Sequence, residues 1–592
     1  MDTINSGTPI PSTSTIQSLI SDAALKYDKQ LAFHVSGKEA LSYLELLASC
    51  KATWKILSEA GISQHDRIAV LLPQGPENAL VCLSVMSVST CVPLNPEYKE
   101  AELEALFKQL NIRLIITAYE VAAAVINVAN TFNIATLVLN IPEEAPAGVF
   151  VLEPTTPKLT LTPNDTVIDS APLQHTDIAL ILHTSGSTGL PKAVPLTHQN
   201  LLTSSNNLIS TLKLTADDCA LNMMPLFHIG ALLDLMLAPL AVGGRIVFSR
   251  DMSANSFFKA LDAFKPSWYQ AVPTMMQDLL AKAKREQLNV DCSSLRFCRS
   301  VSSPLPAAIR EAFEDLFKLP VIEIYGMTET AGVITSNTLA NKTSDSGTLD
   351  VSNTVGKSAG PDIQIADNMG NPAKVNQRGE VIVRGNNVFS GYLGSEPQNE
   401  DFINDWFKTG DEGYLDERGQ LFLSGRIKDI INRGGEKISP IEVDTLLRQH
   451  PLIDDAACFA FTHLSLGEDI AAAIVLKPSS IKASPIQSKH KVNEHELRAF
   501  LASSLAQHKI PHHMFFVKQL PRTSGGKLQR HCLTEEFCSD ASRRDTPTAV
   551  ELCSEQQTLI ASIWKEVLAV PSVNIDDDFF DLGGDSLSAT EF

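Results

Sequence analysis

Short apolar runs alternate with amphipathic segments along most of the chain, and this alternation defines the expected elements. The runs before residue 185 are continuous and rich in branched side chains, which is typical of buried strands. They cover residues 67–72, 114–117, 135–139 and 178–183. Between them, Leu103, Leu106, Phe107 and Leu110 recur at helical spacing and predict one buried helix face. The pattern therefore predicts an α/β fold in which helices cover parallel sheets.

The same alternation continues beyond residue 192 and then changes character. Further strands are expected at residues 245–249, 267–272, 295–298 and 321–325. Around residues 379–384 and 420–423 the strands come closer together, which predicts a small antiparallel β subdomain. Residues 431–535 return to a mixed α and β pattern, so we expect a domain boundary near residues 425–429.

Both ends of the chain differ from its middle. Residues 1–15 are rich in Ser, Thr and Pro and are expected to form a flexible arm. Residues 536–550 have the composition of a polar linker. Beyond it, apolar residues at 560, 563, 564 and 567 predict one face of a helix, and the chain stops at Phe592, a few residues into a further expected helix.

Composition and charge narrow the class of protein. A chain of 592 residues is too long for one core and predicts about three to four domains. The 48 basic and 68 acidic residues give a net charge of −20, which disfavours nucleic-acid and anionic-membrane partners. The ten cysteines are scattered, no leader pattern is present, and no apolar stretch reaches the about 18 residues of a membrane span, so we expect a cytoplasmic protein with reduced thiols.

A glycine- and hydroxyl-rich stretch follows the strand expected at residues 178–183. It consists of Thr184, Ser185, Gly186, Ser187, Thr188, Gly189, Leu190, Pro191 and Lys192. Glycines let backbone N–H groups approach a ligand closely, and hydroxyls and an ammonium group donate to phosphate. The stretch is not the common Gly-x-x-x-x-Gly-Lys-Ser/Thr loop, because Lys192 lies three residues beyond Gly189. A nucleotide phosphate loop and an ordinary surface loop both fit this composition.

Two further stretches place aromatic and ionisable groups at strand ends. Phe227 and His228 would lie beside a cavity, although a lone histidine is more often a satisfied core residue. Tyr325, Thr328 and Glu329 offer a ring for stacking, a hydroxyl for phosphate and a carboxylate for a divalent cation. A turn with a half-buried tyrosine explains the same three residues.

Three charged residues in the C-terminal third complete the candidates. Asp411 stands in an expected tight turn, where its two oxygens could accept from two ribose hydroxyls, but an Asp-containing hairpin turn needs no such role. Arg426 is a planar donor suited to ribose or phosphate, or to an interdomain ion pair. Lys527 lies on a Ser- and Gly-rich loop, where a solvated lysine is the plainest interpretation.

Taken together and in this order, these stretches resemble the adenylate-forming superfamily of acyl-CoA synthetases, peptide-synthetase adenylation domains and luciferases. The resemblance covers about residues 15–535. It implies that the stretch from Thr184 to Lys192 holds the β- and γ-phosphates of ATP, that Tyr325 stacks on adenine, and that Thr328 contacts the α-phosphate. Glu329 would bind Mg²⁺.

The resemblance also implies a fold and a two-step reaction. The large N-terminal domain, residues 16–425, would contain stacked α/β sheets and the β subdomain, and a hinge at 426–430 would join it to a small mobile α+β domain at 431–535. Asp411 would bind the ribose hydroxyls with help from Arg426, and Lys527 would be the catalytic lysine of adenylation. Rotation about the hinge at Lys428 would then replace Lys527 by the segment 434–437, which forms a tunnel for the thiol acceptor.

Departures from the superfamily pattern bear on the ligands. Glu323 stands where an amide is usual, so it could accept from the adenine amino group but could not donate. His228 stands where amino-acid-activating members have aspartate, which implies a carboxylic acid without a free α-amino group and a catalytic role for His228. The acid pocket would include residues 268–274, 299–305 and 332–334. Local similarity is greatest to the oxalate–CoA ligase branch, which has a second histidine where Gly230 stands.

The C-terminal tail indicates an acceptor. Residues 576–587 resemble the phosphopantetheine attachment site of carrier domains, with Ser586 as the modified residue. An acidic loop with a serine at a helix start is the alternative. The expected carrier segment, residues 551–592, is about half of a carrier domain, so we expect the front of a longer synthetase or a truncated product of one, with synthetase or reductase domains downstream.

The leading hypothesis is a loading module that uses ATP and Mg²⁺ to adenylate a small carboxylic acid and transfers the acyl group to 4′-phosphopantetheine on Ser586. An acyl-CoA ligase that uses free CoA is the first alternative. A nucleotide-binding scaffold without catalysis is the second, and the presence of both Lys192 and Lys527 argues against it.

Overall fold

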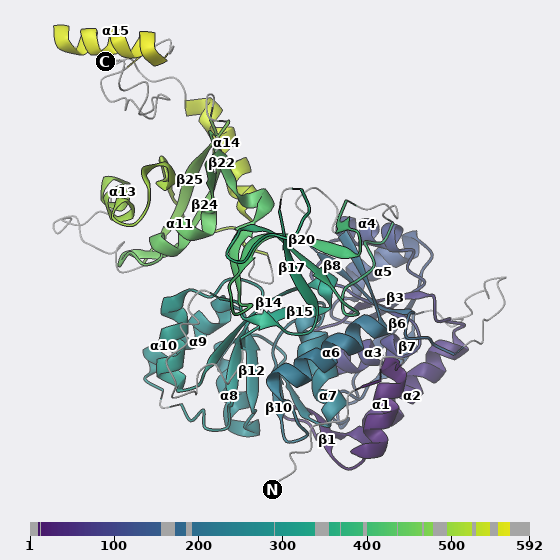
Figure 1. Ribbon diagram of the computed structural model, residues 1–592. Helices are drawn as coiled ribbons and strands as arrows, with labels where there is room; N and C mark the ends of the chain where they lie inside the picture. The colour runs from purple at the N-terminus through teal and green to yellow at the C-terminus, as the bar shows by residue number, and fades with distance from the viewer. Residues whose placement is uncertain are drawn as a thin grey trace. The chain divides into compact units, whose positions relative to one another are not determined.

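Two sheets of mainly parallel strands build the N-terminal part of the chain, as the sequence predicts (Figure 1). The computed structural model describes residues 10–11, 14–155, 172–184, 192–288, 290–337, 354–367, 369–394, 400–434, 436–463, 467–477, 494–523, 528–544, 554–568 and 573. The chain forms two compact units, which we call the N-terminal unit (Met1–Thr409 with Gly413–Leu423) and the C-terminal unit (Gly410–Glu412 with Ser424–Phe592).

A seven-stranded sheet in the N-terminal unit has the order β7-β6-β5-β3-β4-β8-β9. Its strands are β3 (Arg67–Leu71), β4 (Thr90–Pro93), β5 (Leu114–Ala118), β6 (Ala135–Asn140), β7 (Val151–Pro154), β8 (Ile178–Thr184) and β9 (Lys192–Thr197). The middle strands are parallel, and β7 and β9 add antiparallel edges. Helices α3 (Pro76–Met86), α4 (Glu100–Leu110) and α5 (Ala122–Thr131) connect the strands, and α4 buries all four predicted apolar residues.

A nine-stranded sheet in the same unit has the order β16-β15-β14-β13-β12-β10-β11-β1-β2. Its strands are β1 (Leu31–Val35), β2 (Leu41–Ser42), β10 (Cys219–Asn222), β11 (Arg245–Phe248), β12 (Trp268–Ala271), β13 (Phe297–Ser300), β14 (Val321–Met327), β15 (Gly332–Ser336) and β16 (Lys357–Ser358). The run from β1 to β14 through β11, β10, β12 and β13 is parallel.

Helices cover both faces of this second sheet. Helices α8 (Ala254–Phe264), α9 (Pro273–Glu286) and α10 (Ala307–Phe317) lie on one face, where the rings of Phe257 and Tyr269 are 4.7 Å apart. Side chains alternate along a strand, so Gln270 faces the opposite side from Tyr269. On that side lie α6 (His198–Leu212) and the π-helix η1 (Gly230–Leu237). The remaining helices of the unit are α1 (Ile16–Lys26), α2 (Tyr43–Glu59) and α7 (Ala238–Val242).

The predicted antiparallel β subdomain is confirmed. It contains β17 (Asp362–Ala366), β18 (Gly379–Arg384), β19 (Phe402–Ile403), β20 (Trp406–Leu415) and β21 (Leu421–Arg426). The C-terminal unit has its own mixed sheet of β22 (Ile431–Arg433), β23 (Glu436–Ile438), β24 (Ile453–His463), β25 (Gly467–Leu476) and β26 (His513–Phe516). Its helices are α11 (Pro440–Leu447), α13 (Glu494–Ala502), α14 (Arg530–Arg544) and α15 (Glu555–Leu568). Helix α15 contains the apolar residues that predicted it.

Two expectations about irregular segments need correction. Residues 536–544 belong to α14 and not to a linker, because Leu533 and Phe537 of this helix pack on the apolar cluster of β24 and β26. The expected flexible arm is fixed where the structure describes it: Ile10 and the side chain of Asn206 exchange hydrogen bonds of 3.0 and 2.9 Å, and Thr15 caps α1.

No helix in the described ranges combines the length and apolar character of a membrane span.

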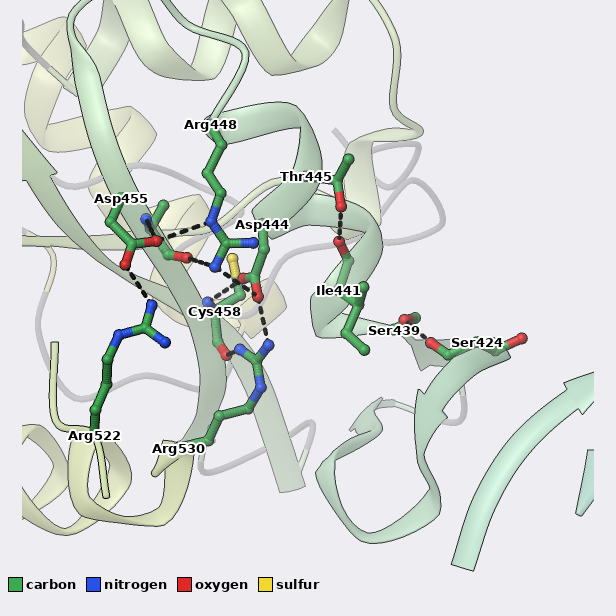
Figure 2. A network of polar contacts seen from close by, with 11 residues as sticks. Ser424, Ser439, Ile441, Asp444, Thr445, Arg448, Asp455, Cys458, Arg522 and Arg530 are labelled. Atoms are coloured by element: carbon green, nitrogen blue, oxygen red, sulfur yellow. Dashed lines mark hydrogen bonds and ion pairs between the residues drawn. The ribbon is translucent and has the colours of Figure 1, made fainter. Parts of the chain in front are cut away.

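A network of buried and partly buried ion pairs links elements of the C-terminal unit (Figure 2). Asp444 of α11, only 1% exposed, accepts a 2.6 Å hydrogen bond from the backbone N–H of Cys458 and pairs with Arg530 of α14. Asp455 of β24 accepts from Arg448 at 2.8 Å and from Arg522 at 2.6 Å. The network therefore ties α11 and α14 to the same strand.

Removal of one buried charge should loosen this unit selectively. In Asp444→Asn the guanidinium of Arg530 loses its buried counter-charge, which destabilises by about 3–5 kcal/mol. We expect hydrogen–deuterium exchange in β24 and β25 to accelerate about 100-fold or more, while exchange in β3 and β5 of the N-terminal unit stays unchanged. Asp454→Asn, an exposed carboxylate on the same strand, is the matched control. Equal protection in both variants would contradict the structural role of the pair.

Candidate active site

The predicted phosphate stretch connects two antiparallel strands. Thr184 ends β8, Lys192 begins β9, and these two residues are paired in the register of the sheet. Ser185, Gly186, Ser187, Thr188 and Gly189 lie outside the described residues, so their role as phosphate donors stays a prediction. The ends of the stretch are nevertheless fixed, because six backbone pairs join β8 to β9.

Lys192 is half exposed and lies against a tyrosine that the sequence analysis did not identify. Its Nζ is 4.1 Å from the ring centre of Tyr392 and 3.7 Å from Oδ1 of Asp401. The hydroxyl of Tyr392 donates a 2.7 Å hydrogen bond to Oε1 of Glu329, the predicted Mg²⁺ ligand. Tyr392 thus links Lys192, at the end of the predicted phosphate stretch, to Glu329, the predicted metal ligand. No spacing or charge around residue 392 signals this role, because its partner lies 63 residues earlier in the chain.

Backbone hydrogen bonds hold the segment around Tyr392 in place. The N–H of Phe389 donates to the carbonyl of Glu329 at 2.8 Å, and the side chain of Asn387 donates to the carbonyl of Thr330 at 3.0 Å. One residue after Tyr392, the N–H of Leu393 donates to the carbonyl of Ala193 at 3.0 Å. The tyrosine is therefore positioned by contacts to both of the segments that it joins.

The predicted adenine and α-phosphate residues follow one another on β14 and the short 3₁₀ helix η2 (Thr328–Thr330). Tyr325 lies on β14 and is half-buried, and Thr328 begins η2. Between them, Gly326 is required, because a Cβ there would lie 2.0 Å from the carbonyl oxygen of Gly332. This close packing brings Tyr325 next to the turn that carries Glu329.

Glu323 is already engaged in an ion pair. Its Oε1 is 3.1 Å from Nη1 of Arg310, and neither side chain is more than 17% exposed. The pair keeps a negative charge on the residue that the sequence places beside adenine, so Glu323 can accept a hydrogen bond from an amino group. The contact with adenine itself stays a prediction.

His228 is a neutral imidazole at the start of the chain segment that leads into η1. Burial lowers its pKa to about 4, so the ring is uncharged at neutral pH. Its Nε2 is buried and has no hydrogen-bond partner in the described part of the chain, and the ring centre lies 4.7 Å from that of Phe227. A neutral ring can exchange hydrogen bonds with a substrate, but it does not supply a negative charge for an ammonium group.

Asp411 is not in the tight turn that the sequence predicts. It lies within the strand β20, after Gly410, whose φ of +71° lets the backbone bend there. Oδ1 of Asp411 accepts from Nε of Arg426 at 2.8 Å, and Asp411 is 6% exposed. The two predicted ribose-binding residues are thus brought together, with Arg426 orienting the carboxylate. Lys428, the predicted hinge position, lies in the 3₁₀ turn η4 (Ile427–Asp429).

Two predicted residues and the expected metal ion complete the comparison with the sequence. Lys527 and Ser586 lie outside the described residues and stay predictions. Among the described residues, no three His, Cys, Asp or Glu side chains cluster as a metal site. A single buried carboxylate such as Glu329 still fits Mg²⁺, which proteins commonly bind through one or two carboxylates together with substrate phosphates.

Family models match three consecutive parts of the chain. Residues 20–393 match the AMP-binding enzyme family, residues 442–527 match the AMP-binding enzyme C-terminal domain, and residues 558–592 match the phosphopantetheine attachment site. The oxalate–CoA ligase of Arabidopsis thaliana is 34% identical over 531 residues, which cover 88% of this chain and 98% of the relative.

Solved structures show the same fold. The ATP-bound structure of MatB from Rhodopseudomonas palustris has a TM-score of 0.75 and 24% identity, and the alignment covers 89% of this chain and 99% of that chain. The O-succinylbenzoate CoA synthetase from Bacillus subtilis, in complex with ATP and magnesium ion, has a TM-score of 0.71 and 25% identity, with coverages of 87% and 98%.

Two substitutions of Tyr392 separate its contacts. Tyr392→Phe removes the hydroxyl that donates to Glu329 but keeps the ring under Lys192. We therefore expect the Mg²⁺ concentration that gives half of the effect on ATP affinity to rise about tenfold, measured by calorimetric titration over a range of Mg²⁺ concentrations. Tyr392→Leu removes the ring as well and should also weaken ATP binding at saturating Mg²⁺.

Tyr414→Phe is the matched control for these variants, since Tyr414 stacks on Phe422 at 4.9 Å and should leave both titrations unchanged. Mg²⁺ dependence that is identical in wild type and Tyr392→Phe would refute the positioning of Glu329 by the hydroxyl.

Proposed function

The chain belongs to the AMP-binding enzyme family of ATP-dependent, AMP-forming carboxylate ligases, and from this premise we propose that it adenylates a carboxylic acid without a free α-amino group and transfers the acyl group to a phosphopantetheine thiol on Ser586. The observation that carries the substrate class is the neutral His228. The ammonium group of an amino acid would be buried here without a counter-charge, because the ring of His228 is neutral. A substrate without that group avoids this cost.

The first step joins two anions, so the chain must neutralise charge. A carboxylate oxygen attacks the α-phosphorus, the bond to the β-phosphate oxygen breaks, and pyrophosphate leaves with the electron pair. Bound Mg²⁺ supplies positive charge among the phosphates. Lys192 would bind the outgoing phosphates from its place beside Tyr392, Thr328 would donate to the α-phosphate, and Glu329 would hold the metal ion.

The residues of the C-terminal unit would complete the first step and permit the second. Asp411 and Arg426 would bind the ribose, and Lys527 would stabilise the charge that develops at the α-phosphate. In the second step the sulfur of a thiolate attacks the acyl carbonyl carbon and AMP leaves with the electron pair of the broken C–O bond. Gly434 and Lys437, on either side of the β22–β23 turn, belong to the segment that would face the thiol after rotation about Lys428.

Two observations support different acceptors. The match of residues 558–592 to the phosphopantetheine attachment site favours a thiol carried on Ser586 of this chain. The names of the relatives, which are CoA ligases, favour free CoA as the second candidate. Both acceptors present the same phosphopantetheine thiol, so the adenylation site does not distinguish them.

Two variants test the two half-reactions. Lys527→Ala should lower ATP–pyrophosphate exchange about 100-fold or more, because it removes a charge that acts on the transition state. Ser586→Ala should leave this exchange unchanged and abolish the covalent acyl–protein product, measured by mass spectrometry of the protein after treatment with a phosphopantetheinyl transferase and CoA.

The controls separate the candidate acceptors. Acyl-CoA formation at an unchanged rate in Ser586→Ala, with no acyl–protein in wild type, would favour the CoA ligase. Exchange at the wild-type rate in Lys527→Ala would refute the assignment of the catalytic lysine, and no exchange with a broad panel of carboxylic acids would refute the proposed function.

A further inference from the structure

A buried charged cluster lies on the face of the nine-stranded sheet that η1 covers. Arg299 of β13 and Gln270 of β12 are paired in the parallel register and point to the same side, and both are 0% exposed. Asp234 of η1 is 3% exposed. Nη1 of Arg299 donates to Oε1 of Gln270 at 2.6 Å and to Oδ2 of Asp234 at 3.0 Å.

The cluster has more hydrogen-bonding groups than it uses. Nε and Nη2 of Arg299 are buried and have no hydrogen-bond partner among the described residues. The side chain of Gln270 also interacts with the carboxylate of Asp234. A buried polar group without a partner destabilises the fold, and a charged one does so more strongly. A protein that only needed a stable core here would be better served by apolar side chains of similar volume. The unused donors therefore point to a ligand.

The position of the cluster agrees with a ligand site. Gln270 and Arg299 are the penultimate residues of parallel strands, and ligands of open α/β sheets bind beyond the carboxyl ends of such strands. Gly230, which is partly exposed, follows His228 by two residues, and a Cβ on Gly230 would lie 2.8 Å from Nε2 of Gln270. The cluster thus lies directly behind the backbone that leads away from His228.

Two glycines pack against the cluster. At Gly230 a larger residue would collide with Gln270, and at Gly332 an added Cβ would approach Oδ1 of Asp234 to 3.6 Å. The close approach at Gly230 means that a side chain there would displace the amide of Gln270. An apolar acyl chain that reached this point would seal the donors away from water without satisfying them, which disfavours it.

We propose that Arg299 and Gln270 bind an oxygen acceptor at the far end of the substrate, so that the acid is short and carries a carboxylate or carbonyl group opposite the carboxylate that is adenylated. This inference rests on the proposed function, because it assigns the substrate class of the same site. The two unpartnered nitrogen atoms of Arg299, Nε and Nη2, carry N–H groups on one planar guanidinium, which suits a carboxylate or carbonyl oxygen, and Gln270 lies beside them. Asp234 orients the guanidinium and offsets part of its charge.

The ionisation of Asp234 decides between the two acceptor types. Burial raises its pKa, although the neighbouring guanidinium opposes this shift. A protonated Asp234 leaves the charge of Arg299 available for a second carboxylate, whereas an ionised Asp234 favours a neutral carbonyl. Both substrates share the same oxygen chemistry, and the experiment separates them.

Three acids with the same arrangement of non-hydrogen atoms test the inference. Succinate, 4-oxopentanoate and 4-methylpentanoate differ only in whether the distal carbon carries two oxygens, an oxygen and a methyl group, or two methyl groups. Shorter and longer pairs, malonate with 3-methylbutanoate and glutarate with 5-methylhexanoate, cover the depth of the pocket. We expect kcat/KM for ATP–pyrophosphate exchange to be about 100-fold or more higher for the oxygen-ended member of at least one length, because a methyl group leaves the donors unpaired.

Variants assign that preference to the cluster. Gln270→Leu removes a donor and keeps the volume, and Arg299→Met combined with Asp234→Leu removes both charges without leaving one unpaired. Each should reduce the preference to within about threefold, with the melting temperature as a check on folding. Asp234→Asn should shift the preference about tenfold from 4-oxopentanoate towards succinate, since the charge of Arg299 is then no longer offset. Tyr414→Phe is the control that should keep the wild-type preference.

The outcomes separate the inference from the proposed function. The inference would be overturned if the protein catalysed exchange with methyl-ended or aromatic acids but not with oxygen-ended ones. It would also be overturned if the preference for oxygen-ended acids survived in both cluster variants. Either result would leave the proposed function standing. No exchange with any acid, by a protein that still binds ATP, would overturn the proposed function and with it the inference.

Discussion

The hydrogen bond from Tyr392 to Glu329 is the contact on which the catalytic arrangement of the N-terminal unit depends. A carboxylate that is 5% exposed needs a partner while no cation is bound, and the hydroxyl at 2.7 Å provides one. The same ring lies 4.1 Å from Nζ of Lys192. One side chain therefore holds both the residue that would bind the metal ion and the residue that would bind the phosphates, so neither has to be ordered separately when ATP arrives.

In the part of the site that would bind the carboxylic acid, polar side chains are also held in place before a ligand is bound. His228 is neutral because it is buried, and Arg299 is buried with two of its nitrogen atoms unpaired. The chain thus keeps donors in place before a substrate is bound, at a cost to its stability. Such preorganisation is useful only if the ligand satisfies the donors, which is why unpartnered groups on this face of the sheet indicate a polar acid and not an apolar one.

The sequence predicts local structure well where one strand or helix is determined by its own pattern. The runs at residues 67–72 and 114–117 became β3 and β5, and the apolar face of residues 103–110 became the buried face of α4. Residues 536–544 are polar in composition and were expected in a linker, but they continue α14, whose Leu533 and Phe537 pack on the apolar cluster of β24 and β26. Asp411 was placed in a turn because it follows Gly410 in a stretch typical of turns, whereas the structure keeps it in β20 and bends the strand at Gly410, whose φ is +71°.

Site residues within one motif were predictable, and residues that join motifs were not. Tyr325, Thr328 and Glu329 follow one another in the chain, so their chemistry is visible together. Tyr392 and Asp234 carry no such signal. Each acts through a partner more than 60 residues away, Glu329 in one case and Arg299 in the other. The sequence placed Arg299 in the pocket only through the superfamily resemblance, and its unused donors became visible only once its partners were known.

The hairpin at the phosphate stretch imposes a further requirement on the chain. In a strand–loop–helix phosphate site the N-terminus of the helix contributes positive potential and free N–H groups. Here the stretch returns directly into β9, and the next helix, α6, begins only at His198. For the proposed binding of phosphates, positive charge would therefore come from side chains such as Lys192, the first residue of β9. Lys192 contacts the face of an aromatic ring and a carboxylate that is 29% exposed, and these contacts are weak enough to be exchanged for phosphate.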